Sequence, residues 1–265
     1  MTKIIMPRPL DRVVILGMGN SLGTWIHSQY ADPFDFDNPR QEVIGINSAI
    51  FPLRVSKCIW IDDHQKDQEA TGFVEKFGKF KVPVITSRAY PEYENTWEFP
   101  LQHCFDHWND TYLRNSIAFA VAWALMCFYP KMHQYKSIVD KARYARNENR
   151  KAPKRIELFG ADFNYKGSNC WEKGRGCVEW WLSRAKDYGV SITLPPSTLL
   201  LDMQTIAQGE VFYGYHEQPE LEQENGYWKI VKRECPDPPD EGNVLVLASP
   251  LKNSVMDQLL RDSPQ

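Results

Sequence analysis

Arg12-Val-Val-Ile-Leu-Gly-Met-Gly-Asn-Ser-Leu-Gly23 is the stretch that decides the fold. Residues 12–16 form a short apolar run of the kind that makes a buried strand, and the glycines that follow it indicate a turn. A short helix is expected to follow through residue 30. Glycines at 17 and 19 permit positive φ angles and a close approach of ligand to backbone, while a helix behind them favours a phosphate. The stretch therefore predicts a strand–turn–helix unit with a candidate anion site at its turn.

Further strand-like and helix-like segments alternate along the first 200 residues. Strands are predicted at 42–46, 57–61, 82–86, 155–159 and 190–194, and helices at 67–77, 116–128 and 177–188. This alternation is typical of a parallel sheet with crossover helices. We therefore expect the α/β class, with a Rossmann-type, mostly parallel sheet flanked by helices. Residues 87–110 show neither period, and we expect an irregular excursion there.

The composition is that of an ordinary globular protein, with 43% hydrophobic and 25% charged residues. The longest apolar stretch, at 116–129, is too short to span a bilayer and has no cleavage site. We therefore expect no membrane partner, no signal peptide and a cytoplasmic location. Six scattered cysteines without a C-x-x-C pair disfavour a zinc ribbon or a disulfide framework.

Positive charge is concentrated in one segment of a chain whose net charge is −3. Residues 131–155 hold nine Lys or Arg and two acidic residues, and we expect an irregular basic insertion there. Three interpretations remain open: a lid over the phosphates of a donor, a contact surface for a polyanion such as DNA, or a solvated helix face. The residues expected to contact a polyanionic acceptor are Lys141, Arg143, Arg146, Arg150 and Lys151.

Polar residues follow the predicted strands where each strand ends. Ligands of open α/β sheets bind outside the carboxyl ends of the strands, so these residues are candidates for a binding site. Turn formation explains many of them nearly as well. The G-x-G-x-x-x-G spacing, and the lack of an acidic residue at the end of the second strand, disfavour an NAD enzyme. The candidates are Gly17, Gly19, Asn20, Ser21, Asn47, Ser48, Asp162, Tyr165, Ser168 and Asn169.

Asp62 and Asp63 follow the third predicted strand and are the strongest candidates for chemistry. Adjacent side chains of a strand point in opposite directions, so one carboxylate is expected to face the site. That carboxylate could bind a phosphate-bound divalent cation or accept a proton as general base. A helix cap is the alternative. His103 and His107, at i and i+4, could share a metal on a helix, but the segment predicts no helix and no third ligand.

The order of these signatures resembles a superfamily that includes bacterial sialyltransferases and archaeal-type hydroxymethylpterin pyrophosphokinases. It is more similar still to small phage-encoded proteins of that superfamily. The pieces that carry the resemblance are 17–22, 47–49, 62–63, 115–118, 156–162, 167–168, 179–182 with Ala185, 189–190, 195–197 and 213–215.

The resemblance implies a modified Rossmann-like fold in which residues 1–215 form a transferase domain that binds a nucleotide-sugar donor. The sequence pattern predicts one strand at 244–248 and a short terminal helix in the remaining residues, 216–265, which we expect to form an appendage. The resemblance also implies that Asn20, Asn47 and Ser116 contact the nucleotide. The sialyltransferases use a histidine base after the Gly-Ser loop, whereas this chain has no histidine between 133 and 216. Asp63 or Asp62 becomes the candidate base instead.

The resulting hypothesis is a glycosyltransferase that acts on a hydroxyl acceptor. A hydroxymethylpyrimidine in phage DNA would suit the basic segment, although such an enzyme must reach or flip the base. One alternative is a magnesium-dependent pyrophosphokinase or other phosphoryl transferase, and another is a non-catalytic nucleotide- or DNA-binding protein. The sequence leaves the need for a divalent metal and the oligomeric state open.

Overall fold

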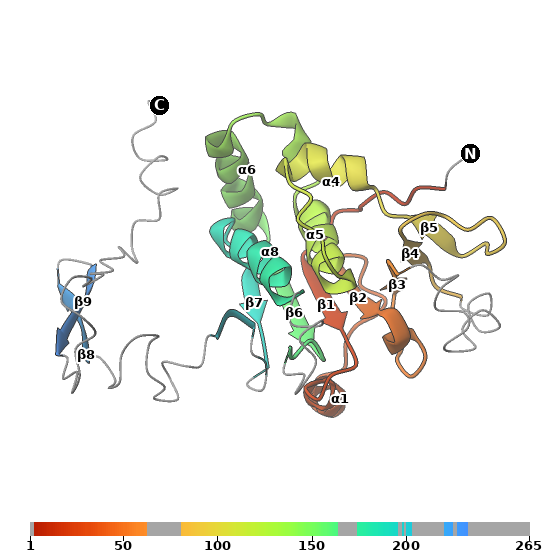
Figure 1. Ribbon diagram of the computed structural model, residues 1–265, viewed down its shortest axis with the longest axis horizontal. Coiled ribbons are helices and arrows are strands. Elements are labelled where there is room, and N and C mark those ends of the chain that lie inside the picture. Colours follow the sequence, from red (N-terminus) through yellow and green to blue (C-terminus); the bar gives the residue numbers. More distant parts are fainter. Residues whose placement is uncertain are drawn as a thin grey trace, which may run out of the picture. The chain divides into compact units, whose positions relative to one another are not determined.

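A computed structural model describes residues 3–62, 81–163, 174–195, 198, 200–202, 220–224 and 227–232. Seven parallel strands form one sheet in the order β5-β4-β3-β2-β1-β6-β7 (Figure 1), which confirms the predicted α/β class and Rossmann-like parallel sheet. The strands are β1 (Arg12–Leu16), β2 (Gln41–Ile46), β3 (Lys57–Ile59), β4 (Val84–Thr86), β5 (Thr96–Glu98), β6 (Arg155–Phe159) and β7 (Ser191–Thr193).

The order of the strands fixes the place of a ligand site. The chain first adds β2 to β5 on one side of β1 and then returns to add β6 and β7 on the other side. The direction of winding therefore reverses between β1 and β6. In open α/β sheets such a switch point opens a crevice at the carboxyl ends of the strands.

Helices cover both faces of the sheet. Val14 of β1 and Val43 of β2 share a buried cluster with Trp25 of α1. Glu42, the neighbour of Val43, points to the other face and accepts a hydrogen bond from Trp123 Nε1 of α5, 3.3 Å away. α1 and α5 therefore cover opposite faces. The helical elements are α1 (Leu22–Ala31), η1 (Asn47–Ile50), α4 (Leu101–Trp108), α5 (Ser116–Phe128), η2 (Met132–Gln134), α6 (Ile138–Lys151), α8 (Arg175–Asp187) and η3 (Leu200–Asp202).

Residues 87–110 are not irregular throughout, because they contain β5 and α4. α4 has eight residues and buries Cys104, His107 and Trp108 along one face. These spacings are helical, but the buried residues include a histidine and no aliphatic side chain. The apolar residues of this segment therefore do not by themselves show a helical period.

The basic segment also differs from the expected irregular insertion, since residues 138–151 form the regular helix α6. The Ser137 side chain accepts a hydrogen bond from Asp140 N–H and caps the helix. Ala142 and Ala145 are the buried residues of α6. A narrow alanine stripe is therefore enough to pack a helix in which half of the residues are charged.

The outer edge of β5 pairs with the start of the chain. Ile4 forms a parallel bridge with Glu98, and Glu98 N–H donates to the Lys3 carbonyl oxygen at 2.8 Å. No described helix is long and apolar enough to cross a membrane.

The chain divides into two compact units, residues 1–200 and 201–265. The second contains an antiparallel pair, β8 (Glu220–Glu224) and β9 (Tyr227–Lys232), which the sequence did not predict. The helix predicted at 67–77, the strand at 244–248 and the terminal helix lie outside the described residues. The boundary at residue 215 stays a prediction.

Candidate functional site

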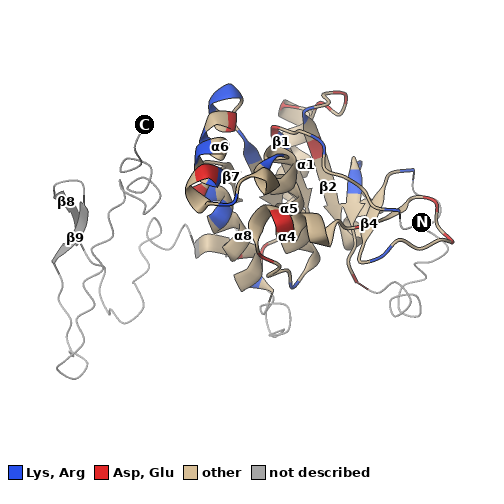
Figure 2. Ribbon diagram, turned by 90° about the horizontal axis from the view of Figure 1, so that it is seen from above, with Lys and Arg blue, Asp and Glu red and all other residues tan. Residues whose placement is uncertain are grey.

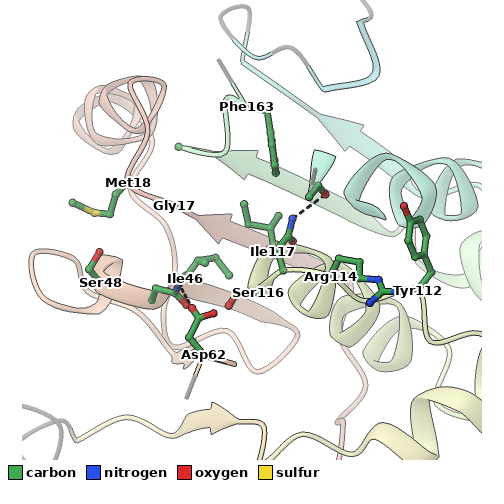
Figure 3. Close-up of a pocket in the computed structure, with 14 residues that line it drawn as sticks. Gly17, Met18, Ile46, Ser48, Asp62, Tyr112, Arg114, Ser116, Ile117 and Phe163 are labelled. Atoms are coloured by element: carbon green, nitrogen blue, oxygen red, sulfur yellow. Dashed lines mark hydrogen bonds between the residues drawn. The ribbon is translucent and has the colours of Figure 1, made fainter. Parts of the chain in front are cut away.

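A pocket of about 730 Å³ lies at the carboxyl edge of the sheet, beside the ends of β1 and β6 (Figure 3). Its size is within the range of pockets that hold nucleotide-sized molecules. Five of the predicted site residues line it, namely Gly17, Asn47, Ser48, Asp62 and Ser116. The other lining residues are Met18, Ile46, Tyr112, Arg114, Asn115, Ile117, Gly160, Phe163 and Gly174.

The floor of the pocket is a close crossing of two backbone segments. Gly17 N–H donates to the Phe159 carbonyl at 2.8 Å, and Gly19 N–H donates to the Gly160 carbonyl at 2.8 Å. A Cβ on Gly17 would lie 2.3 Å from the Gly160 oxygen, and Gly160 itself has a φ of +69°. Glycine is therefore required at both positions for the turns after β1 and β6 to touch.

The side chains of Ser21 and Asp162 connect these two turns by hydrogen bonds. Asp162 Oδ2 accepts from Ser21 N–H at 2.8 Å, and Ser21 Oγ accepts from Gly160 N–H at 2.7 Å. Both side chains are buried, and neither lines the pocket. Gly19 and the exposed Asn20 also lie outside the lining. Ser21, Asp162 and Gly19 therefore hold the turns that form the pocket wall, whereas Asn20 does not take part in these contacts.

Asn47 and Asp62 form a polar pair on the β2–β3 side of the pocket. Asn47 follows β2 with a φ of 49°, a left-handed conformation that asparagine tolerates better than most residues. Its Nδ2 donates to Asp62 Oδ2 at 2.9 Å. The exposed Asp62 carboxylate therefore has a fixed orientation in the pocket (Figure 3).

The amino end of α5 opens into the same pocket. Asn115 caps this 13-residue helix by accepting from Ala118 N–H at 2.8 Å, and its Nδ2 donates to the Gly174 carbonyl at 2.9 Å. Ser116 and Ile117, the first two helical residues, line the pocket, as does the exposed Arg114 just before them. The positive end of the helix and the guanidinium together make this wall suited to an anion.

Arg114, Tyr112 and Phe163 are lining residues that the sequence analysis missed. Phe163 is 3% exposed and adopts a φ of 50° directly after Asp162. It follows a predicted strand end, so the rule that found Asp162 could also have found it. Arg114 and Tyr112 precede a predicted helix, so the rule for strand ends does not apply to them.

The remaining predicted residues do not join the pocket in the described part of the chain. Asp63, Tyr165, Ser168 and Asn169 lie outside the described residues. The five basic residues lie on α6, which Figure 2 shows with its Lys and Arg in blue. Lys151 precedes the first residue of β6 by four positions, so α6 ends at the amino edge of the sheet. The pocket lies at the carboxyl edge, and the five residues of β6 span about 17 Å between the two edges.

Comparisons with known proteins add little to this geometry. No protein-family model and no curated protein matches the chain. Among solved structures, a point mutant of the α-2,3/8-sialyltransferase CstII is 15% identical with a TM-score of 0.36. The match covers 72% of this chain and 84% of that chain. The strand order of the sheet, not this weak likeness, defines the fold.

Proposed function

We propose that the chain is a glycosyltransferase that moves a sugar from a nucleotide-sugar donor to a hydroxyl acceptor. One observation carries the proposal: the pocket at the switch point holds an anion-binding wall, formed by Arg114 and the start of α5, together with the carboxylate of Asp62. The resemblance of the sequence to the sialyltransferase superfamily points to the same class of donor.

The α5 wall suits the phosphate of the donor. The first-turn N–H groups of a helix have no partner within the helix, and Arg114 adds a full positive charge beside them. Tyr112 and Phe163 offer aromatic surface in the same pocket for a base or a sugar ring. Polar groups at fixed places in a partly apolar pocket are what orient a small ligand.

Asp62 supplies the acid–base chemistry of the proposed reaction. The acceptor hydroxyl oxygen forms a bond to the anomeric carbon of the sugar while its proton passes to the carboxylate. The bond between the anomeric carbon and the phosphate oxygen breaks, and its electron pair leaves with the nucleotide. Arg114 and the α5 amino end stabilise the charge on the leaving phosphate. Asp63, the other predicted base, stays an alternative.

The proposed acceptor is a molecule that carries a hydroxyl group, and the pocket does not require this molecule to be a polyanion. The predicted DNA acceptor rested on Lys141, Arg143, Arg146, Arg150 and Lys151. These side chains belong to α6 at the opposite edge of the sheet from the α5 amino end. We therefore keep the hydroxymethylpyrimidine acceptor only as one substrate to be assayed.

A phosphoryl or pyrophosphoryl transferase is the second candidate, since the same wall would hold the phosphates of ATP. Such an enzyme needs carboxylates that bind magnesium. Asp62 is the single carboxylate among the described lining residues, which favours glycosyl transfer. Release of AMP from ATP, dependent on magnesium, would identify the second candidate.

The test is calorimetric titration with UDP, GDP, CMP and their sugars, with and without magnesium, followed by an assay for hydrolysis of the donor that binds. We expect one nucleotide to bind at one site per chain. Arg114→Met should weaken binding at least tenfold, since a charge-assisted contact contributes about 1.5–3 kcal/mol. Asp62→Asn should retain binding and lose turnover.

Arg150→Gln is the matched control, because it removes an exposed arginine at the other edge of the sheet. It should bind the nucleotide as the parent chain does. Equal weakening by Arg114→Met and Arg150→Gln, or no nucleotide binding at all, would contradict the proposed donor site. Unchanged turnover in Asp62→Asn would remove Asp62 from the mechanism.

A further inference from the structure

Three histidines meet far from the pocket, at the amino edge of the sheet. His103 and His107 lie one turn apart on α4, and His133 lies in η2. Their ring centroids are separated by 4.1, 4.9 and 5.4 Å. One nitrogen of each ring lies within 4.8 Å of the others. The helix and the third ligand, which the sequence did not predict, are therefore both present.

We propose that His103, His107 and His133 bind a divalent transition-metal ion of the zinc type. Imidazole nitrogen is a preferred ligand of such ions, and two histidines at i and i+4 on a helix present their rings to one ion. Zinc–nitrogen bonds of about 2.0–2.1 Å place tetrahedral ligand atoms roughly 3.4 Å apart. Separations of up to 4.8 Å need to close by up to about 1.4 Å, which rotation of the half-buried His103 and the exposed His133 can provide.

The surroundings of His107 favour a cation at one of its nitrogens. Its Nδ1 lies 2.8 Å from the His103 carbonyl oxygen, and its Nε2 lies 3.2 Å from the Pro130 carbonyl oxygen. A neutral imidazole has one donor nitrogen and one acceptor nitrogen. With Nδ1–H donating to the carbonyl of His103, the lone pair of Nε2 faces an oxygen. Metal binding at Nε2 would replace this unfavourable contact, and the Pro130 carbonyl oxygen must turn aside for it, because 3.2 Å leaves no room for an ion between the two atoms.

Two of the three rings, those of His103 and His107, are in the form that binds metals. Burial, with the nearby His103 and His133, lowers the pKa of His107 to about 4. Burial also lowers the pKa of His103. At neutral pH both rings are therefore uncharged, with a lone pair available for coordination. In metal sites the ring nitrogen that does not bind the metal commonly donates to a carbonyl oxygen, as His107 Nδ1 can to the His103 carbonyl.

The site differs in place and role from the donor pocket. α5 begins at the pocket with Ser116 and ends at Phe128, two residues before Pro130, so about 20 Å of helix separates the two. The metal would join α4 to η2 and so fix the connection between α5 and α6. Among the described residues the site has three protein ligands, which leaves a fourth position for water.

The electrostatic neighbourhood contains charges of both signs. The Lys141 ammonium donates to the His107 carbonyl oxygen and opposes a second cation. Asp106 lies close enough to favour a positive charge at His103. Ligand bonds to the three imidazoles must therefore provide most of the affinity.

The test uses the untagged full chain, freed of metal with a chelator and titrated with cobalt(II) and zinc. We expect one ion per chain, visible absorption bands of cobalt(II) bound to nitrogen ligands, displacement of cobalt by zinc, and a melting temperature that rises with zinc and falls with chelator. His103→Ala and His133→Ala should each weaken binding at least tenfold. Both side chains lie outside the fully buried core, so the variants should fold.

His27→Ala is the matched control, since His27 is an exposed histidine on α1. It should bind cobalt as the parent chain does. The proposal is overturned if no stoichiometric ion binds, if His103→Ala and His133→Ala bind as well as the parent, or if His27→Ala loses the ion. Nucleotide binding should be unchanged in all three variants, which separates this test from that of the proposed function.

Discussion

Gly17→Ala should strongly destabilise the fold, because the added methyl group meets backbone that cannot move aside. A Cβ at this position lies 2.3 Å from the Gly160 oxygen, where ordinary contact begins at 3.4 Å, so the two turns must separate by about 1.1 Å. Overpacking of this kind costs about 1–3 kcal/mol. The movement also strains the hydrogen bonds from Gly17 N–H and Gly19 N–H, each contributing about 1 kcal/mol. We expect a total loss near 3 kcal/mol.

Urea denaturation followed by tryptophan fluorescence measures this loss, and Gly23→Ala is the control. A Cβ on Gly23 meets nothing within 4 Å, and Gly23 lies in α1. Alanine there should stabilise the chain by about 0.5–1 kcal/mol. The reasoning is refuted if Gly17→Ala unfolds at the same urea concentration as the parent chain. It is also refuted if the two variants lose equal stability.

Three further expectations concern other parts of the molecule. Asn115→Ala removes the cap of α5, and it should lower the free energy of unfolding by about 1 kcal/mol and weaken nucleotide binding. Ser137→Ala removes the cap of α6, and it should lower the stability by about the same amount but leave nucleotide binding unchanged. Melting curves measure the stability, and titrations measure the binding. Glu42→Gln breaks the ion pair with Lys57, whose charged atoms are 2.9 Å apart and whose side chains are at most 7% exposed, and it should lower the free energy of unfolding in urea by about 3–5 kcal/mol. Adding Lys57→Met removes the charge left without a partner and should restore part of this stability. His107 has a pKa of about 4 in the folded chain, below the unfolded value of about 6.5, so in the presence of chelator its contribution to the free energy of unfolding is complete above pH 6.5. About 3 kcal/mol of this free energy should be lost by pH 4. His107→Asn should flatten the dependence of the unfolding free energy on pH, and an unchanged dependence would contradict the assignment to His107.

The sequence predicted the two central strands β1 and β6 well because both are mainly apolar and each is followed by a glycine. β1 and β6 have the predicted bounds, 12–16 and 155–159. The rule that ligands bind at strand ends correctly brought Asn47 and Asp62 to one pocket. β5 has only three residues, one of them buried, and the buried face of α4 holds a histidine and no aliphatic side chain, so neither shows a hydrophobic period in the sequence.

The rest of the site depends on contacts between distant residues. Ser21 and Asp162 each looked like a ligand-binding residue, but they are 141 positions apart and satisfy each other. Only the three-dimensional contact shows that their polar groups are used within the wall. In the same way, His133 gains a chemical meaning only because η2 returns the chain to α4.

The bridge between Ile4 and Glu98 has a consequence for self-association. A sheet edge presents free N–H and C=O groups that can recruit a strand from another molecule and so begin aggregation. β5 is an edge of this sheet, and residues 3–4 already use the outward N–H of Glu98. Residues 3–4 therefore cover part of this sheet edge. Removing them would expose the edge of β5 for strand pairing with another molecule.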